Sequence, residues 1–257
     1  MRAFVIGMGE VGRRLADALS AAGWEVVPVT RHAGWERAAG DEDGLRLVCV
    51  REEALPEVAA RLSEVPGRRL AFVQNGWVRP VLEPLGEVTR GLIWFTAKGE
   101  FFRVLRPTPF HGPAARELAA ALERGGIPAE AVGGEAEFAR LDADKMGFNC
   151  VVGLPLAVHG VSLGEYLDRF ADEARAVFTE AVTVCSAALG VPAAPAWEAF
   201  LAAVEPIRWV SASRAKALEY RNGAVVSLAE RFGLGAPVNG KLLAAWAAEG
   251  GGRPAAP

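Results

Sequence analysis

A lysine and an asparagine in the second half of the chain are spaced to act on one ligand. Lys145 and Asn149 are four residues apart, so on a helix they lie one turn apart on the same face. Their surroundings are apolar: Phe138, Met146, Phe148, Val151 and Val152. A lysine there either extends its amine to solvent or is partly desolvated, and desolvation lowers the pKa of an amine toward the range useful for proton transfer. The spacing alone leaves both alternatives open.

A glycine-rich segment near the start of the sequence has the spacing of a dinucleotide-binding loop. Its residues, Gly7-Met8-Gly9-Glu10-Val11-Gly12, follow a strand-like run and precede a helix-like one. In a G-x-G-x-x-G motif the first glycine permits a tight turn, the second lets a pyrophosphate approach the backbone, and the third lets helix and strand pack closely. The phosphates then lie on the free N–H groups of the helix N-terminus. We interpret the segment as a dinucleotide site rather than a purely structural turn.

The end of the next strand indicates which dinucleotide binds. NAD-selective sites usually place an acid there to bind the ribose hydroxyls, but this strand ends in Thr30 and Arg31. An arginine can pair with the 2′-phosphate of NADP and stack on adenine, and Thr30 can add a hydroxyl. The alternative is a solvated arginine after a strand. We expect NADP(H).

Other polar residues follow elements that would place them near a ligand. Asn75 comes directly after the fourth strand, at the carboxyl edge of the sheet where ligands bind in open α/β folds. Ser211 and Ser213 precede Glu219, which as a helical acid is otherwise expected to be solvated. Asn222-Gly223 falls inside an apolar helical pattern, where glycine costs about 1 kcal/mol relative to alanine. Close helix packing would explain that glycine.

The first half of the sequence alternates strand and helix patterns. The expected strands are Arg2–Ile6, Glu25–Thr30, Leu45–Val50, Leu70–Val73, Val88–Phe95 and Phe101–Leu105, the last two forming a hairpin around Lys98-Gly99. The expected helices are Val11–Ala22, Pro56–Val65 and Ala114–Arg124. This alternation predicts a Rossmann-type, doubly wound parallel sheet with right-handed crossovers.

Strand patterns stop after about Glu135, and the sequence then has helical periodicity to Glu249. The expected helices are Glu137–Val151, Leu163–Leu189, Trp197–Ala203, Ala212–Phe232 and Val238–Ala248. The sequence therefore predicts an α/β dinucleotide-binding domain over residues 1–135, an all-α C-terminal domain over 136–249 and a loose tail over 250–257.

Composition excludes several classes of protein. The 257 residues carry 28 Lys and Arg against 31 Asp and Glu, a formal charge of −3, which argues against a nucleic-acid partner. No apolar run is long enough for a membrane-spanning helix, and the first residues leave no room for a signal peptide. Cys49, Cys150 and Cys185 have no paired spacing, and the three histidines lie far apart, so we expect free thiols, no metal site and a cytoplasmic protein.

Taken together, these residues resemble the ketopantoate reductase (2-dehydropantoate 2-reductase) family, within the 6-phosphogluconate dehydrogenase-like proteins. The resemblance covers nearly the whole chain. It rests on the order and spacing of five features: the loop Gly7–Gly12 with Arg31, Gln74-Asn75-Gly76, Lys145-x-x-x-Asn149-Cys150, Glu219-Tyr-Arg-Asn222-Gly223, and Pro237-Val-Asn239. The last two are similar to the family's T-E-[IL]-D-x-[IL]-N-G and later P-x-N.

The resemblance implies hydride transfer from NADPH to the keto carbon of a 2-keto acid. Lys145 would then be the general acid on the forming alkoxide, where a nearby cation also stabilises the developing charge. Asn75 would help fix nicotinamide and substrate, Asn149 and Glu219 would hold the substrate, and Ser211 or Ser213 would bind its carboxylate. The resemblance also allows a homodimer formed by the helical domain.

The sequence departs from the family's pattern at several positions. The chain is shorter than typical members, Arg51 stands where the family has a lysine after the third strand, and Gly153 replaces an asparagine one turn beyond Asn149. Ser211 and Ser213 also lie nearer Glu219 than the family serine does. These departures fall mainly on the substrate side.

We therefore expect an NADPH-dependent reductase of a small 2-keto acid or related carbonyl compound. One alternative is a β-hydroxyacid dehydrogenase, which also uses a Lys-x-x-x-Asn helix. A second, from another class, is an NADP(H)-binding regulator without turnover. Consumption of NADPH on a carbonyl substrate separates an enzyme from the regulator.

Overall fold

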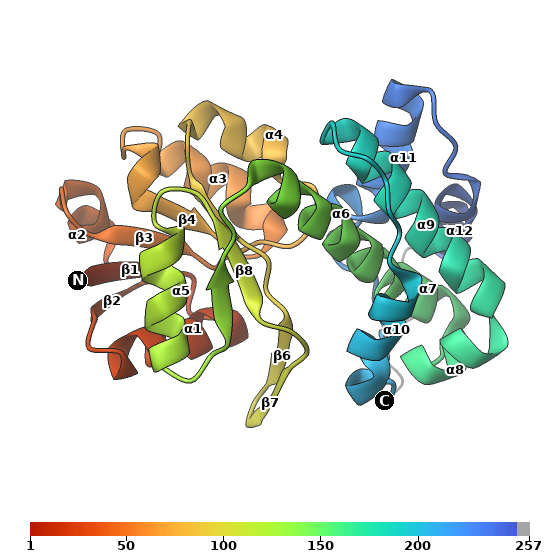
Figure 1. Ribbon diagram of the computed structural model, residues 1–257, viewed down its shortest axis with the longest axis horizontal. Coiled ribbons are helices and arrows are strands. Elements are labelled where there is room, and N and C mark those ends of the chain that lie inside the picture. Colours follow the sequence, from red (N-terminus) through yellow and green to blue (C-terminus); the bar gives the residue numbers. More distant parts are fainter. Residues whose placement is uncertain (251–257) are drawn as a thin grey trace. The chain divides into compact units, whose positions relative to one another are not determined.

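The computed structural model describes residues 1–250 and divides the chain into two compact units (Figure 1). The N-terminal unit contains Met1–Gln74 and Val78–Phe138, and the helical unit joins Asn75–Trp77 to the chain from Ala139 onward. The expected tail lies outside the described residues from position 251. Within residues 1–250 no helix has the length and apolar character needed to cross a bilayer.

The N-terminal unit is built on a seven-stranded sheet with the order β2-β1-β3-β4-β5-β8-β9. The strands are β1 (Arg2–Ile6), β2 (Glu25–Val29), β3 (Leu45–Val48), β4 (Leu70–Phe72), β5 (Thr89–Gly91), β8 (Thr108–His111) and β9 (Ala129–Ala131). The first five strands are parallel, whereas β8 pairs antiparallel with β5 and parallel with β9. The expected doubly wound α/β fold is confirmed, with β8 and β9 as additions that the sequence pattern did not reveal.

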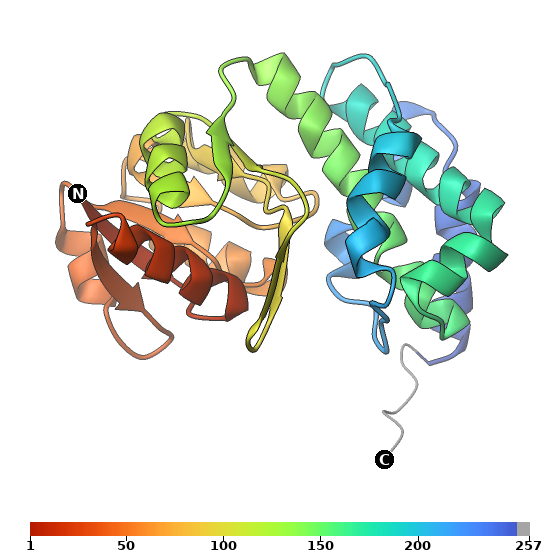
Figure 2. The same ribbon diagram turned by 60° about the horizontal axis from the view of Figure 1, so that its bottom comes forward.

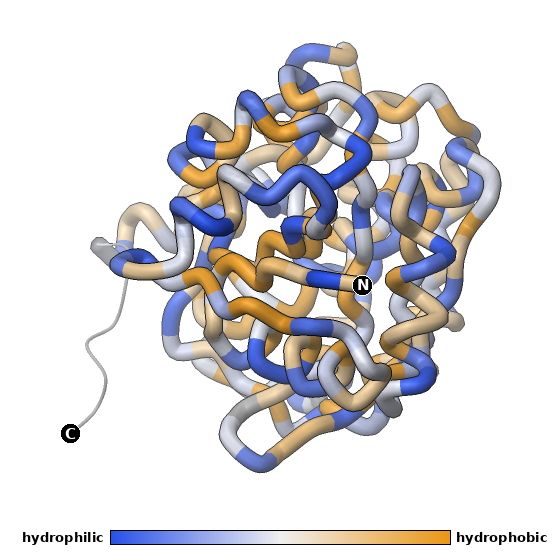
Figure 3. The backbone as a smooth tube through the Cα atoms, turned by 90° about the vertical axis from the view of Figure 1, so that its left-hand side faces the viewer, coloured by the Kyte–Doolittle hydropathy of each residue, from blue (hydrophilic) through white to orange (hydrophobic). Residues whose placement is uncertain are grey.

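Helices cover both faces of this sheet. They are α1 (Glu10–Ala21), α2 (Trp35–Gly40), α3 (Leu55–Arg61), α4 (Arg79–Leu82) and α5 (Ala115–Arg124). Figures 1 and 2 show α1 and α5 side by side over one face, where Leu15, Leu19 and Leu118 are fully buried in a core that includes Val5 and Leu47 of the sheet. In Figure 3 the most apolar stretches of this unit run through its middle as strands, as expected for a sheet buried on both faces.

The expected strand Val88–Phe95 is wrong as a single element. Only Thr89–Gly91 pairs in the main sheet, and the chain then leaves it to form a separate hairpin of β6 (Phe95–Lys98) and β7 (Phe101–Val104). A Cβ at Gly91 would lie 2.3 Å from the Phe110 ring, so the sheet is closely packed where the strand ends. The hairpin itself, expected around Lys98-Gly99, is confirmed.

The helical unit is all-helical as expected, but two of the predicted helices differ in the structure and one helix was not predicted. Its helices are α6 (Glu135–Val151, which begins in the N-terminal unit), α7 (Leu154–His159), α8 (Leu163–Arg169), α9 (Ala171–Ala188), α10 (Trp197–Val204), α11 (Asn222–Phe232) and α12 (Pro237–Ala248). The short α7, which the sequence does not predict, begins at Leu154 directly after Gly153 and has Pro155 as its second residue.

The expected continuous helix Leu163–Leu189 is broken in the structure at Phe170. This residue has φ −128° and ψ 37°, outside the helical region, and its ring stacks on His159 with centroids 4.1 Å apart. Glu173 accepts hydrogen bonds at the same junction from the Tyr166 hydroxyl (3.1 Å) and contacts His159 Nε2 at 2.7 Å. Buried apolar residues recur at three- and four-residue steps in both helices, for example Tyr166 in α8 and Ala174 and Val177 in α9. Because this spacing continues across the break, periodicity alone does not reveal the break.

The expected helix Ala212–Phe232 is also wrong in its first ten residues. Ala217 has φ +49°, a left-handed conformation that ends any helix, and only a short 3-10 turn, η5 (Leu218–Tyr220), precedes α11. Helix α11 starts at Asn222, so Gly223 lies in its first turn. A Cβ at Gly223 would be 2.7 Å from the Leu218 carbonyl, so the close contact that requires this glycine is with the preceding turn η5 and not, as expected from the sequence, with another helix.

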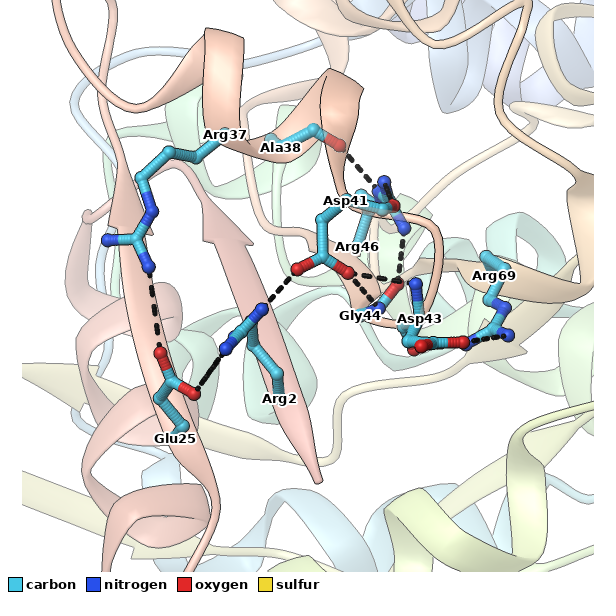
Figure 4. Close-up of polar contacts among 9 residues, drawn as sticks. All are labelled: Arg2, Glu25, Arg37, Ala38, Asp41, Asp43, Gly44, Arg46 and Arg69. Carbon is cyan, nitrogen blue, oxygen red and sulfur yellow. Dashed lines mark hydrogen bonds and ion pairs between the residues drawn. The ribbon is translucent and has the colours of Figure 1, made fainter.

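A polar network ties the amino ends of the first strands to the loop before β3 (Figure 4). Asp41 accepts backbone hydrogen bonds from Asp43 (2.9 Å) and Gly44 (2.6 Å) and pairs with Arg2, which also binds Glu25. Nearby, the buried Arg46 donates from Nε to the carbonyl of Ala38 and from its guanidinium to the carbonyls of Asp41 and Gly44. The conformation of the loop before β3 is therefore stabilised by hydrogen bonds from the side chains of Asp41 and Arg46 to backbone groups.

Replacing Asp41 tests this network through its pH dependence. The Gly44 N–H, and next the Arg2 guanidinium, lower the pKa of Asp41 from its ordinary 3.8 to about 2. A lowered pKa stabilises the fold above pH 3.8 and stops doing so as the pH falls through about 2. We expect Asp41→Ala to lose about 1 kcal/mol of unfolding free energy at neutral pH, with a gap to wild type that narrows in acid.

Denaturant unfolding of both proteins between pH 7 and pH 2 measures this gap. Asp17→Ala, at an exposed position on α1, serves as the control for loss of a carboxylate. A gap of constant size across the range would show that the Asp41 carboxylate does not stabilise the loop through its charge.

Candidate functional site

The three glycines of the loop Gly7–Gly12 meet three different geometric demands. Gly7 has φ +99°, and a Cβ there would lie 2.9 Å from the Val50 backbone nitrogen after β3. A Cβ at Gly12 would lie 1.9 Å from the Gly7 carbonyl oxygen, so only glycine lets α1 pack on the end of β1. A Cβ at Gly9 would meet no atom within 4 Å. The first and third glycines thus serve the fold, and the second leaves open space.

The open space at Gly9 lies at the N-terminus of helix α1. Gly9 is the N-cap of the 12-residue α1, and no side chain caps its first N–H groups. Free N–H groups and the helix dipole attract an anion at such a place. Met8 and Val11 pack against the core, while Gly9 and Glu10 are exposed. The loop therefore fits the pyrophosphate of a dinucleotide.

The residues expected to choose the dinucleotide lie in a tight turn directly after β2. The Thr30 N–H donates to the Ala33 carbonyl (3.0 Å), and Gly34 closes the turn with φ +90°. Thr30 and Arg31 are both exposed. Within residues 1–250, the ion pairs of the structure do not include Arg31. Its guanidinium is thus accessible to a phosphate.

In the helical unit, Lys145 and Asn149 lie on α6 with exposed fractions of 4% and 5%. Of the two alternatives for Lys145, the structure therefore takes the desolvated one. The Lys145 Nζ lies 4.1 Å from the centre of the Phe148 ring, a cation–π contact that holds the ammonium against an aromatic face.

An aromatic cluster fixes that face. Phe148 packs edge-on against Phe200 (centroids 6.1 Å apart), which in turn contacts Phe178 of α9 (5.1 Å). A Cβ at Gly147 would lie 2.6 Å from the Phe178 ring, so this glycine lets α9 approach α6 closely between Lys145 and Asn149. Packing of the helices, rather than a loop, therefore positions the lysine.

Two amide groups of this unit point to a ligand. The Asn149 Nδ2 and the Asn75 Oδ1 are buried and, among the described residues, have no hydrogen-bond partner. Buried polar atoms are nearly always paired, so an unpaired donor and an unpaired acceptor mark places where a bound molecule can supply the partner.

Asn75 belongs to the helical unit because its segment is anchored there. The Trp77 N–H donates to the Tyr220 carbonyl (2.7 Å), and a Cβ at Gly76, which has φ +88°, would lie 2.5 Å from the same oxygen. Gln74 remains in the N-terminal unit, where its Nε2 binds the carbonyls of Val48 and Val50. In the expected turn Gln74-Asn75-Gly76, Gln74 therefore has a structural role, and Asn75 is the candidate site residue.

The residues Asn222 and Asn239 form a buried network that holds the end of α6. The Asn222 Nδ2 donates to the Cys150 carbonyl (3.2 Å) and to the Asn239 Oδ1 (2.9 Å). The Asn239 Nδ2 donates to Glu180 (2.8 Å), which also accepts from the N–H groups of Val238 and Asn239 at the start of α12. These motif residues thus have structural partners.

Ser211, Ser213 and Glu219 are exposed, unlike Lys145 and Asn149. Ser211 forms an isolated β-bridge with Ser162, and Glu219 lies in the turn η5. Counted back from Asn222-Gly223, the glutamate of the motif T-E-[IL]-D-x-[IL]-N-G falls at Ala217, and Glu219 takes the place of its aspartate. In the described part of the chain, no hydrogen bond joins these three residues to α6.

Sequence reasoning did not assign a role to Arg221. Its guanidinium Nη1 lies 4.0 Å from the position that a Cβ at Gly153 would occupy, one turn beyond Asn149. The sequence does hold a signal for it: Arg221 stands directly before Asn222-Gly223, where the motif T-E-[IL]-D-x-[IL]-N-G has isoleucine or leucine.

The three cysteines are free thiols whose surroundings disfavour the thiolate. Burial raises the pKa of Cys49 and Cys185, and it raises the pKa of Cys150 to about 12 although the positive charge of Arg221 acts in the opposite direction. Thiols with such pKa values stay protonated at neutral pH.

Comparison with solved structures identifies the fold. A PanE/ApbA family ketopantoate reductase from Ralstonia eutropha superimposes with a TM-score of 0.76 at 20% sequence identity, over 95% of this chain and 96% of that one. The fold is that of the ketopantoate reductases. No protein-family model and no curated protein matches the sequence.

Two further structures with this fold widen the comparison. D-mandelate dehydrogenase, solved in complex with NADH, has a TM-score of 0.75 at 16% identity, over 97% of this chain and 98% of that one. A dimeric ketopantoate reductase from Staphylococcus aureus has a TM-score of 0.73 at 14% identity, over 96% and 100%. The ketopantoate reductase fold therefore spans both units of the chain.

The glycine loop yields a paired prediction. Gly9→Ala places a methyl group in open space, so we expect the melting temperature to stay within about 2 °C while NADPH affinity falls roughly tenfold, because the methyl group keeps a pyrophosphate from the backbone. Gly12→Ala instead collides with the Gly7 carbonyl, so we expect it to lower the melting temperature by several degrees. Thermal melts and NADPH fluorescence titrations measure both. Unchanged NADPH affinity in Gly9→Ala would show that the loop is a structural turn only.

Proposed function

We propose that the protein is an NADPH-dependent reductase of small 2-keto acids. The observation that carries the proposal is the buried Lys145 ammonium one helical turn from Asn149, whose Nδ2 has no hydrogen-bond partner within residues 1–250. A proton donor and a hydrogen-bond donor held on one rigid helix can act on the same carbonyl group. The ketopantoate reductase fold and the open loop at Gly9 support the same conclusion.

The dinucleotide would be held by the N-terminal unit. The backbone of Gly7–Gly12 fits the pyrophosphate, and Thr30 with Arg31 would bind the adenosine ribose and its 2′-phosphate. Reduced nicotinamide supplies a hydride when it is bound. Preference for NADP over NAD rests on Arg31, because a guanidinium pairs with a phosphate and gains less from a ribose hydroxyl.

Lys145 would supply the proton. When a hydride adds to a keto carbon, the carbonyl oxygen becomes an alkoxide and needs a proton, and an ammonium gives up a proton more readily when it is desolvated. The Phe148 ring, 4.1 Å away, limits the positions open to the Lys145 Nζ. The cation also stabilises negative charge on the oxygen before the proton moves.

The amides would hold the reacting groups. Asn149 would donate to the substrate through its unpaired Nδ2, and the Asn75 Oδ1 would accept from the nicotinamide or the substrate. Glu219 and the hydroxyl of Ser211 or Ser213, which would bind the substrate by resemblance, are exposed. The substrate is a small carboxylate, because the group of donors formed by Lys145 and Asn149 favours an anion.

Replacing Lys145 tests the proton donor. We expect Lys145→Met, which keeps the length and apolar stem of the side chain, to lower kcat on 2-keto acids by about 10²- to 10⁴-fold. NADPH affinity should stay within about threefold, because the dinucleotide is held elsewhere. The measurement is NADPH absorbance across a panel of 2-keto acids, with Lys241→Met at an exposed position of α12 as the control. NADPH binding without turnover on any carbonyl compound, in the wild type, would favour a regulator.

Replacing Arg31 tests the choice of cofactor. We expect Arg31→Ala to weaken NADPH binding by roughly 10- to 100-fold, the value of a charge-assisted contact to phosphate, and to leave NADH binding nearly unchanged. Titration of each cofactor into wild type and variant gives the two ratios. Arg37→Ala, whose partner Glu25 lies on the surface, is the matched control. An equal loss for NADPH and NADH would contradict the assignment of NADP(H).

A further inference from the structure

Arg221 is held between two anchors in the helical unit. The residue before it, Tyr220, accepts the 2.7 Å hydrogen bond from the Trp77 N–H, and the residue after it, Asn222, donates to the Cys150 carbonyl on α6 (3.2 Å). One anchor ties the backbone at Arg221 to the segment of Asn75, and the other ties it to the end of the lysine helix. The two anchors together fix the backbone from which the Arg221 side chain extends.

The guanidinium of Arg221 lies next to the turn that follows the carboxyl end of α6, the helix that carries Lys145 and Asn149. Gly153 follows Asn149 by four residues and Lys145 by eight, and the helical hydrogen bonds continue as far as Val152. The point where a Gly153 Cβ would stand is 4.0 Å from the Arg221 Nη1 and 3.2 Å from the Asn149 carbonyl oxygen. Even a methyl group at Gly153 would be in van der Waals contact with the guanidinium, so Arg221 lies directly beside the residue one turn beyond Asn149.

The groups gathered there are mostly donors. Lys145 carries a positive charge, the Asn149 Nδ2 is a buried donor without a partner in the described chain, and Arg221 is a half-buried cation. A guanidinium presents its N–H groups as a planar fork that matches both oxygens of a carboxylate. By contrast, the two serines that would take this role by resemblance are exposed.

We propose that Arg221 binds the carboxylate of the substrate and so selects 2-keto acids over neutral carbonyl compounds. The inference rests on the proposed function, since it concerns the same site. It divides the roles in the helical unit: Lys145 serves the keto oxygen, and Arg221 serves the carboxylate on the neighbouring carbon. Gly153 contributes by leaving this position free of a side chain.

The test compares a 2-keto acid with its methyl ester, which has the same keto group and no charge. We expect Arg221→Leu to lower kcat/KM for the acid by about 100-fold, as for loss of one partner of a desolvated charge pair, and to leave the ester within about threefold. Arg221→Lys keeps the charge but not the fork, and we expect it to restore part of the loss for the acid. Arg214→Leu removes an exposed arginine from the same region and should change neither substrate.

An arginine that only stabilises the end of α6 gives a different pattern. Arg221→Leu would then lower acid and ester activity equally, or lower the melting temperature with no change in the acid-to-ester ratio. Either result overturns the inference while leaving the proposed reductase intact. If Arg221→Leu does not fold, the acid-to-ester ratio of Arg221→Lys decides, and an unchanged ratio there counts against the inference.

Binding of oxamate, an unreactive mimic of a 2-keto acid, separates this inference from the proposed function. Calorimetric titration should show binding to the wild type in the presence of NADP and at least tenfold weaker binding to Arg221→Leu. A wild type that reduces no 2-keto acid yet binds oxamate through Arg221 refutes the reductase and keeps the carboxylate site. Equal oxamate affinity in wild type and variant refutes the site, whatever the activity.

Discussion

The Asn222 side chain donates one hydrogen bond to the Cys150 carbonyl on α6 and one to Asn239 at the start of α12, and the rest of the helical unit depends on this pair of contacts. Asn239 is fully buried and passes the chain of hydrogen bonds to Glu180 of α9. A buried amide that loses its partner costs about 1–3 kcal/mol. The network therefore fixes how α6, α9, α11 and α12 pack on one another. This packing positions Lys145 and Asn149 on α6 and Arg221 directly before α11.

The two units solve different physical problems. In the N-terminal unit, Gly7 and Gly12 are required by the backbone itself, and their packing leaves Gly9 open at the N-terminus of α1. In the helical unit, a lysine is kept away from water by an aromatic face, and amides without partners lie in the same unit. The first arrangement suits a phosphate, and the second suits the proton and the hydrogen bonds that a carbonyl group needs as it gains charge.

Patterns of local spacing could be predicted from the sequence, whereas features set by contacts distant in sequence could not. The strands Arg2–Ile6 and Leu45–Val48, helix α6 and the loop Gly7–Gly12 follow from periodicity and glycine spacing. The break at Phe170 depends on a ring stacked against His159, which no period records. The strands β8 and β9 have weak strand signals, because β8 (Thr108–His111) contains a proline and β9 (Ala129–Ala131) consists of two alanines and a glutamate.

The candidate site shows the same limit. The spacing of Lys145 and Asn149 placed them on one face, but their burial depends on α9 and the Phe148–Phe200 contact. The position of Arg221 depends on hydrogen bonds from Trp77 and to Cys150, residues far away in sequence. Glu219 was expected on a helix, but Ala217 turns the chain before α11 begins, and Glu219 lies exposed in the turn η5.

The central claim is that a hydride passes to the keto carbon of a carboxylate substrate, and isotope transfer tests it most directly. The protein is incubated with NADPH carrying deuterium at both C4 positions and a small 2-keto acid, and the product is analysed by mass spectrometry. We expect a 2-hydroxy acid with one deuterium on C2, formed in equal amount to the NADP released. Unchanged cofactor with every 2-keto acid, or a product without the label, would contradict the account.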